Sequence, residues 1–214
     1  MLYSVNLNLS SNQRDPMQDK ELKEASNIIS NDGVIITPTD TLYGLAANIF
    51  SSKGVNRIFD IKDRDRKMAL PILVSNWEQC LPLVTGDLEL GFQLQQKFWP
   101  GALTMIFKKT SRVPDYLTAG KDTVAVRMPN HSAPIFLCQN SESPITGTSA
   151  NLSGDPDALR LSDIPESILS NVDKVLNTRP VPQGVPSTII DLSGTTPIIL
   201  RQGAIYLDEV LKEV

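Results

Sequence analysis

The sequence has little of what common catalytic centres require. It holds one histidine and two cysteines among 214 residues. A single histidine excludes a site with two histidine ligands, and any nucleophile–histidine relay must run through His131. Cys80 and Cys138 are too few for a disulfide framework or a cysteine-based zinc site, so no protein-held metal centre is expected. No apolar run approaches the ~18 residues of a membrane span, and no basic residue precedes an apolar stretch at the N-terminus. We therefore expect a cytoplasmic protein with no membrane association.

The charge balance is mildly acidic, which limits the partners of the chain. Twenty basic and 24 acidic residues give a net charge of −4. A protein that binds nucleic acid over its whole surface is normally basic, so any anion-binding must be local. The hydrophobic content of 41% excludes intrinsic disorder, and only 12 glycines exclude a collagen-like repeat. The length allows one large or two small domains.

Helical and strand patterns are intermixed along the chain. Apolar periodicity predicts a helix through 22–29, a second that starts at Ser51 or Ser52 and ends in the charged stretch 62–67, and further helices at 88–98 and 207–214. Strands are predicted at 34–37, 70–74, 103–107, 123–127, 144–148, 187–191 and 198–201. Mixing of this kind favours one α/β domain over residues 1–214. The order is not a strict strand–helix alternation, so we expect a mixed parallel and antiparallel sheet with flanking helices. Segment 178–186, rich in proline, is a loop too short for a domain linker.

Well-known nucleotide and nucleophile motifs are absent. No Gly-x-Gly-x-x-Gly follows a strand, and Gly120-Lys121 lacks the earlier glycine of a P-loop. There is no Gly-x-Ser-x-Gly elbow and no His-Glu-x-x-His. His131 stands at a predicted helix start, where a capping or surface role is favoured over catalysis.

Two polar clusters occur in the first third of the chain. Residues 37–44 place three threonines, an aspartate and a tyrosine directly after a strand, with Gly44 expected to allow chain reversal. This segment is either a ligand-binding loop or a turn that caps the next helix. Residues 62–67 hold four cations at a helix C-terminus, and they form either a solvated helix end or a clamp for polyphosphate.

Two further clusters follow strands in the middle of the chain. Arg127 ends a strand with small residues on its own face, where it is placed to grip a carboxylate or to form a surface ion pair. Segment 147–154 concentrates small and hydroxyl-bearing residues, typical of an anion-binding concavity but also of an ordinary Ser/Asn turn. Segments 187–191 and 198–203 each combine an apolar strand with a polar residue at one end.

Together, these fragments resemble the YrdC family of threonylcarbamoyl-AMP synthases. Seven motifs occur in order over residues 38–203: Pro-Thr-Asp-Thr-Leu-Tyr-Gly-Leu, Ile-Lys-x-Arg, Trp-Pro-Gly-x-Leu-Thr, Val-Ala-Val-Arg-Met-Pro, Thr-Ser-Ala-Asn-Leu-Ser-Gly, Ser-Thr-Ile-Ile-Asp and Ile-Leu-Arg-x-Gly. The resemblance implies a twisted mixed α/β sheet with a concave basic face. It also implies the short form of the family, without a second C-terminal domain.

The resemblance implies an activity and a set of partners. Members of this family condense L-threonine, bicarbonate or CO2, and ATP into L-threonylcarbamoyladenylate, releasing pyrophosphate. The product serves the N6-threonylcarbamoyladenosine modification of tRNA. This nucleotidyltransferase reaction implies ATP as substrate, Mg²⁺ as its companion ion, a separate threonylcarbamoyl-transferase as partner and at most a weak contact with tRNA.

Site residues are carried over by motif position. The resemblance implies that Thr41, Arg127 and Ser187 bind threonine, that Leu73 and Gly147 contact it through backbone, and that Arg64, Met68, Thr123, Ser149, Asp157 and Arg201 contact ATP. Lys62 and Arg64 are expected to neutralise the triphosphate during catalysis. Position 68 departs from the family, which usually has Lys or Asn followed by Pro. An acidic residue at 157 suits a ribose or Mg²⁺ better than a phosphate.

Two alternatives come from other functional classes. One is an RNA-binding or ribosome-maturation module that uses the same concave basic face, although the net charge and the sparse aromatics disfavour this as the main role. The other is a carbamoyl-transfer module like the YrdC-type domain of hydrogenase-maturation proteins. Such domains act beside zinc-finger segments, and no Cys-x-x-Cys pair is present here.

Overall fold

The computed structural model describes residues 16–86 and 88–206. The C-terminal helix predicted at 207–214 lies outside the described residues. The helices are α1 (Pro16–Ser30), α2 (Ser52–Ile61), α3 (Trp77–Cys80), α4 (Glu89–Phe98), α5 (Asp115–Thr118), α6 (Ser132–Asn140) and α7 (Glu166–Leu169), with short 3-10 turns at Leu81–Leu83 and Leu161–Asp163.

The strands form two hydrogen-bonded sheets. They are β1 (Ile35–Pro38), β2 (Tyr43–Ala46), β3 (Ile72–Leu73), β4 (Val84–Thr85), β5 (Leu103–Lys109), β6 (Thr123–Arg127), β7 (Ile145–Thr146), β8 (Thr148–Ser149), β9 (Lys174–Val175), β10 (Thr188–Asp191) and β11 (Ile198–Arg201). The smaller sheet has the order β8-β2-β1-β9, and the larger has the order β11-β10-β5-β6-β3-β7 with β4 beside β5.

Both sheets mix strand directions, as the sequence predicts. The pairs β10–β5, β3–β6 and β1–β9 are parallel, whereas β1–β2, β5–β6 and β10–β11 are antiparallel. Strand β7 belongs to the larger sheet and β8 to the smaller, and only Gly147 separates them. The chain therefore passes from one sheet to the other at this residue.

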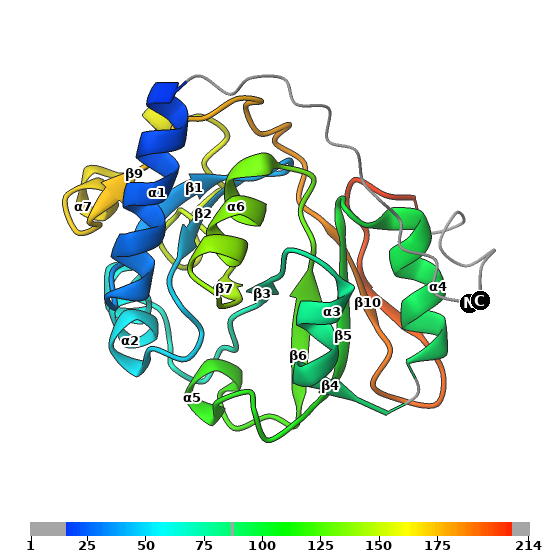
Figure 1. The fold of residues 1–214 in the computed structure, drawn as a ribbon. Coiled ribbons are helices and arrows are strands. Elements are labelled where there is room, and N and C mark those ends of the chain that lie inside the picture. The colour runs from blue at the N-terminus through cyan, green and yellow to red at the C-terminus, as the bar shows by residue number, and fades with distance from the viewer. Residues whose placement is uncertain (1–15, 87, 207–214) are drawn as a thin grey trace.

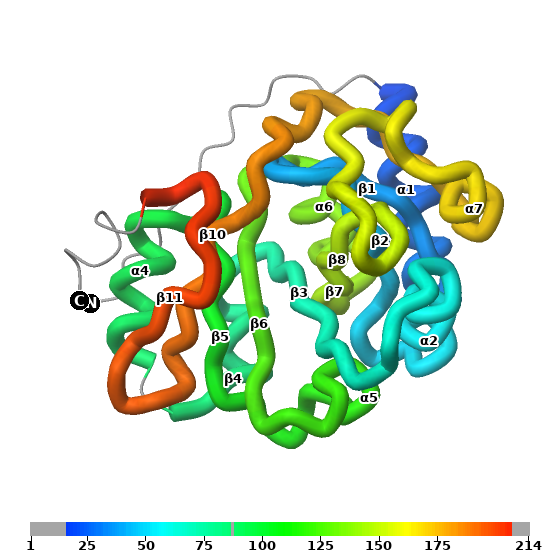
Figure 2. Tube along the Cα trace, turned by 180° about the vertical axis from the view of Figure 1, so that it is seen from behind, coloured from blue at the N-terminus to red at the C-terminus, as the bar shows by residue number. Residues whose placement is uncertain are grey.

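Helices cover one side of the strands. In Figure 1, α1, α6, α3 and α4 lie on the viewer's side of the strands, and Figure 2 shows β5, β6, β10 and β11 from behind with no helix in front of them. Leu22, Ala25 and Ile29 of α1 pack with Ala133 and Leu137 of α6 in one apolar cluster. Among the described residues, no helix covers the opposite side of the larger sheet in these views.

Helix boundaries follow local capping chemistry. Ser51 Oγ accepts a hydrogen bond of 2.9 Å from the Gly54 amide and so caps α2. His131 Nδ1 accepts from the Ala133 amide at 3.1 Å and caps α6. His131 is only 2% exposed, so of its two favoured roles capping is confirmed and a surface position is not.

Strand β2 is the main element that the sequence does not reveal. The sequence predicts a polar loop or turn over residues 37–44, but residues 35–38 and 43–46 pair as an antiparallel hairpin with a four-residue connection. Gly44 does not reverse the chain. It lies within β2, where an added Cβ would stand 3.2 Å from the Thr148 carbonyl oxygen of the neighbouring strand.

None of the helices within residues 16–86 and 88–206 has the length and apolar character needed to cross a membrane.

Candidate functional site

A pocket of about 360 Å³ opens between the two sheets, within the size range of small-molecule sites. Its wall combines hydroxyl groups, small residues and three arginines from separate segments. The polar and charged lining residues are Thr37, Thr39, Thr41, Tyr43, Arg64, Thr104, Arg127, Thr146, Thr148, Ser149, Asp157, Ser187 and Arg201. Three guanidinium groups against one carboxylate make this wall cationic, although the chain as a whole is acidic.

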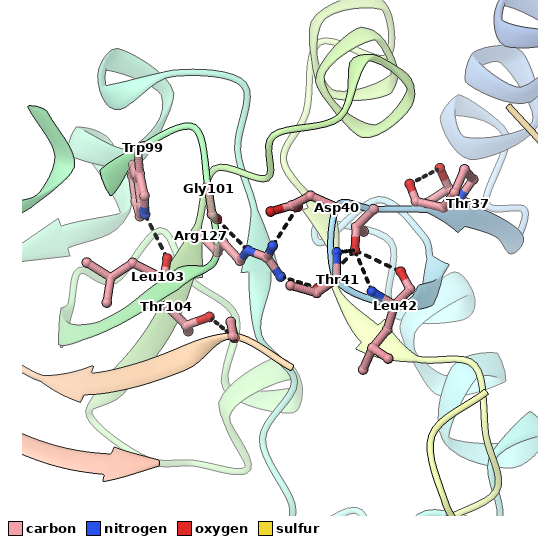
Figure 3. Close-up of polar contacts among 12 residues, drawn as sticks. Thr37, Asp40, Thr41, Leu42, Trp99, Gly101, Leu103, Thr104 and Arg127 are labelled. Carbon is pink, nitrogen blue, oxygen red and sulfur yellow. Dashed lines mark hydrogen bonds and ion pairs between the residues drawn. The ribbon is translucent and has the colours of Figure 1, made fainter. Parts of the chain in front are cut away.

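Arg127 is held from three directions at the end of β6. Its Nε donates to the Gly101 carbonyl oxygen at 2.8 Å, Nη1 donates to Thr41 Oγ1 at 2.7 Å, and Nη2 donates to Asp40 Oδ1 at 2.5 Å. Figure 3 shows the guanidinium reaching between Gly101 and the Asp40–Thr41 turn. Arg127 is 6% exposed, and burial lowers its pKa while Asp40 opposes the shift. The guanidinium is therefore a fixed, paired cation at the pocket wall.

The hairpin turn presents Thr41 to this arginine. Thr39 Oγ1 accepts hydrogen bonds from the Thr41 and Leu42 amides, both at 3.1 Å, and lies 3.0 Å from Thr41 Oγ1. A hydroxyl that bonds to the backbone two and three residues on fixes a tight turn. The threonine-rich segment is thus not a helix cap but a hydrogen-bonded turn, with the Thr39 and Thr41 hydroxyls in the pocket wall.

Arg201 and Ser187 form a second polar group at the edge of the larger sheet. Arg201 Nε donates to the Ser187 carbonyl oxygen at 2.9 Å, and Nη2 donates to Ser187 Oγ at 3.1 Å. Ser187 Oγ also lies 2.8 Å from Thr104 Oγ1 of β5. Gly203 allows the chain after β11 to return close to β10, because a Cβ there would lie 2.3 Å from the Pro186 carbonyl oxygen.

Arg64 follows α2, and one of its hydrogen-bond donors is unpaired. Its Nη2 donates to the Ala69 carbonyl oxygen at 3.0 Å, while its buried Nε has no hydrogen-bond partner. A buried donor without a partner costs about 1–3 kcal/mol, and a bound anion removes that cost. Arg64 is therefore suited to hold a phosphate.

Lys62 lies behind the wall of the pocket. It is 1% exposed, and its ammonium donates to the carbonyl oxygens of Ser149 and Asn151 and, at 3.2 Å, to Asn151 Oδ1. Burial, followed by the neighbouring Arg64 charge, lowers the pKa of Lys62 to about 8. Its own carbonyl oxygen accepts from the Ser153 amide at 3.0 Å. Lys62 thus fixes the 149–153 turn that carries Ser149 into the pocket.

Gly147 makes room for Leu73 at the passage between the sheets. A Cβ on Gly147 would lie 2.6 Å from Leu73 Cγ, closer than real carbon contacts. Both residues line the pocket, and the Gly147 amide donates to the Pro71 carbonyl oxygen at 2.9 Å. Only glycine at 147 lets the two strands bring these groups together without displacing Leu73.

The structure brings most of the sequence-predicted site residues into this one pocket. Those on its lining are Thr41, Arg64, Leu73, Arg127, Gly147, Ser149, Asp157, Ser187 and Arg201. Lys62, Met68 and Thr123 are not on the lining. Met68 is 48% exposed on the segment after α2, and Thr123 lies at the far end of β6, four residues or about 13 Å from Arg127. Direct contacts of these three residues with a ligand remain predictions.

Sequence reasoning missed the residues that hold the predicted site residues in place. Asp40 and Gly101 hold Arg127, Thr104 contacts Ser187, and Asn151 accepts from Lys62. Each of these residues lies inside one of the seven family-like motifs, but the resemblance assigns it no role. The polar and glycine positions of those motifs that have no assigned role were therefore the signal that could have identified these residues.

A metal ion would find few ligands on this chain. Among residues 16–86 and 88–206, no group of three or more His, Cys, Asp or Glu side chains is placed to hold one. Asp157 supplies the carboxylate on the pocket lining. Mg²⁺ accepts one carboxylate together with phosphate oxygens and water, so the pocket fits a magnesium ion that arrives with a nucleotide.

Comparison with known proteins identifies similar chains. A family model named Sua5/YciO/YrdC, described as telomere recombination, matches residues 27–203. The threonylcarbamoyl-AMP synthase of Pyrococcus abyssi is 35% identical over 203 residues, which cover 95% of this chain and 60% of that protein. The protein of the same name from Bacillus subtilis is 31% identical over 193 residues, covering 90% of this chain and 56% of that one.

A solved structure matches equally well. The crystal structure of P. abyssi Sua5 complexed with L-threonine has a TM-score of 0.86 to this chain at 36% identity, covering 90% of this chain and 57% of that one. The chain thus spans less than two thirds of the length of these relatives.

Proposed function

The chain belongs to the Sua5/YciO/YrdC family, and from this premise we propose that it is an L-threonylcarbamoyladenylate synthase. The observation that carries the proposal is the convergence of Arg64, Arg127 and Arg201 on one hydroxyl-lined pocket. An amino-acid carboxylate and a nucleotide are both anionic ligands, and this pocket offers separate cations for each. The name of the relatives supports the choice of substrates.

L-Threonine is assigned to the end of the pocket that holds Arg127. Three of the five guanidinium N–H groups are bonded to protein oxygens, which leaves two for a carboxylate. The hydroxyls of Thr41, Thr39 and Ser187 lie on the same wall and suit the threonine side-chain hydroxyl. L-Valine has no hydroxyl to hydrogen-bond with this wall, so it should bind more weakly than L-threonine.

ATP is assigned to the end that holds Arg64, Ser149 and Arg201. Arg64 lines this end of the pocket and supplies a cation for the phosphates, and the Lys62 charge lies directly behind the wall. Asp157 lines the same pocket and would hold a ribose hydroxyl or the ion that accompanies the triphosphate. A magnesium ion bound with ATP would neutralise phosphate charge and draw its ligands mainly from phosphate and water.

The chemistry needs positioning and charge neutralisation more than proton relay. The threonine amine adds to CO2 and loses a proton, forming a carbamate. A carbamate oxygen attacks the α-phosphorus of ATP, the bond to the bridging oxygen breaks, and pyrophosphate leaves. Alignment of bound reactants contributes about 7–11 kcal/mol, and fixed cations stabilise the developing phosphate charge. A site built from arginines and hydroxyls is suited to this reaction.

The product defines further partners. A mixed anhydride of a carbamate and AMP hydrolyses readily, so the reaction that consumes it must follow closely, and we assign that step to a separate threonylcarbamoyl-transferase acting on tRNA. A direct contact with tRNA is at most weak, because the cations of the pocket are recessed and the whole chain is acidic. A location in the cytoplasm accords with this role.

A pyrophosphate-release assay tests the proposal. Purified protein supplied with Mg·ATP and bicarbonate should release pyrophosphate with L-threonine, less with L-serine and least with L-valine. Folded protein without threonine-dependent turnover would contradict the assignment. Salt-sensitive binding of tRNA without any ATP chemistry would instead favour the RNA-binding module.

Two arginine variants test the division of the pocket. Arg127→Ala should weaken binding of L-threonine at least tenfold and change ATP affinity little, because its neighbours are the turn hydroxyls. Arg64→Ala should do the reverse. Calorimetric titration with each ligand separately measures both effects, and equal losses in the two variants would show that the division is wrong.

A further inference from the structure

Asp40 is a partly buried acidic residue that the proposed chemistry does not use. Its carboxylate accepts from Arg127 Nη2 at 2.5 Å, and the two side chains are only 12% and 7% exposed. Asp40 does not line the pocket, whereas Arg127 does. The carboxylate therefore contacts the arginine from behind and leaves the pocket side of the guanidinium open.

The geometry points to Asp40 as the positioning residue of the carboxylate site: it holds Arg127 so that the remaining guanidinium N–H groups face an amino-acid carboxylate. This inference rests on the proposed function, since it names the group that prepares the threonine end of the pocket. Thr41 Oγ1 and the Gly101 carbonyl oxygen are the other two anchors. Both are neutral acceptors, so Asp40 alone supplies a charged hydrogen bond to the guanidinium among its described contacts.

Charge balance explains why a carboxylate stands there. A buried guanidinium without a counter-charge is costly, and in the empty pocket Asp40 provides that counter-charge. Arg201 lies close enough to act electrostatically on Arg127, which strengthens the need for a fixed anion behind it. When an amino acid binds, its carboxylate meets an arginine that is already oriented, so little conformational freedom is lost on binding.

The position of Asp40 is itself fixed by the surrounding chain. Its carbonyl oxygen accepts from the Gln183 amide at 3.1 Å, and the Thr41 carbonyl oxygen accepts from the Gly184 amide at 2.8 Å. The Thr39 hydroxyl holds the turn from the other side. The carboxylate is thus mounted on backbone that is bonded on both flanks, as a positioning group requires.

Two substitutions at Asp40 separate positioning from charge. Asp40→Ala removes the anchor, and it should weaken L-threonine binding at least tenfold while ATP affinity stays within threefold. Asp40→Asn keeps an oxygen acceptor for Nη2 but removes the counter-charge, so L-threonine affinity should stay within threefold of wild type while folding stability falls. Asp60→Ala is the matched control, because Asp60 pairs with Arg66 at the surface and should leave both affinities unchanged.

Two readouts distinguish positioning from a general structural role. Wild type and Asp40→Asn should prefer L-threonine over its methyl ester, and Asp40→Ala should lose this preference. The Arg127 Nε–H NMR signal, assigned by its loss in Arg127→Lys, should exchange slowly in wild type and Asp40→Asn and rapidly in Asp40→Ala.

The binding and exchange measurements can support or overturn the role of Asp40. Unchanged threonine affinity in Asp40→Ala, or equal losses for threonine and ATP, would overturn the role of Asp40. Equal weakening in Asp40→Asn and Asp40→Ala would overturn it as well. If wild type binds no L-threonine, the proposed function fails, and exchange of the Arg127 Nε–H alone then decides whether Asp40 positions the arginine.

Discussion

Lys62 illustrates how a residue serves a site without lying on its surface. The motif predicts a cation that meets the triphosphate, but the ammonium is bonded to oxygens of Ser149 and Asn151. Its charge still acts on the pocket, since Arg64 lies close enough to help lower its pKa. For single residues, the sequence identifies which side chains gather at the pocket, but it does not tell which of them face its interior.

Loss of the Lys62 charge should weaken nucleotide binding. The pKa of Lys62 is lowered to about 8, so the side chain is mostly an ammonium at pH 7 and mostly a neutral amine at pH 9. ATP affinity should therefore fall as pH rises from 7 to 9, while L-threonine affinity changes less. Titration calorimetry across this range measures the effect.

Lys62→Met should abolish that pH dependence and weaken ATP binding already at pH 7. Lys67→Met is the control, because Lys67 is an exposed cation of the same segment. A pH profile that is identical in wild type and Lys62→Met would refute the role assigned to the buried charge.

Among elements, the β7–Gly147–β8 segment determines how the two sheets meet. The sequence predicts one strand over 144–148, because hydroxyl and β-branched residues continue through Gly147. The structure instead divides this run between two sheets. The sequence does not reveal strand β2, because its first residues, Tyr43 and Gly44, continue the polar segment 37–44 and resemble the end of a loop.

Gly147→Ala should damage the end of the pocket proposed to bind L-threonine. The added methyl group would lie 2.6 Å from Leu73 Cγ, so Leu73 must shift at a cost of about 1–3 kcal/mol. We expect L-threonine affinity to fall about tenfold and the melting temperature to drop by several degrees. Gly194→Ala is a matched control, because its nearest neighbour would be 3.8 Å away. Equal behaviour of the two variants in calorimetry and thermal unfolding would show that the close approach at 147 is unimportant.

At the scale of the whole molecule, loop 178–186 connects distant parts. His131 Nε2 lies 2.9 Å from the Pro180 carbonyl oxygen, and the Gln183 and Gly184 amides bond to the hairpin turn. The sequence predicts the loop correctly, yet these attachments join residues far apart in the chain. Mixed strand directions, flanking helices and the grouping of arginines were predictable, whereas the partners of those arginines depend on such long-range packing.

The attachment through His131 should make stability depend on pH. Burial lowers the pKa of His131 below its ordinary value near 6.5. Below that pH the unfolded chain takes up a proton that the folded chain refuses, so this residue lowers stability as pH falls. His131→Asn keeps a capping side chain for α6 but does not titrate.

The stability advantage of wild type over His131→Asn should therefore be largest at pH 7–8 and shrink towards pH 5, as measured by urea unfolding. His131 is the one histidine of the sequence, so the difference between the two proteins isolates its titration. A constant difference across this range would contradict the buried neutral state.

The dipeptide Asp40–Thr41 faces two ways: its side chains hold Arg127, and its carbonyl oxygens hold loop 178–186. Any attempt to change the ligand preference of the pocket through the hairpin turn will also disturb the loop. Altered selectivity is therefore easier to engineer from the Thr104–Ser187 side, where a hydroxyl can be exchanged without loosening the backbone.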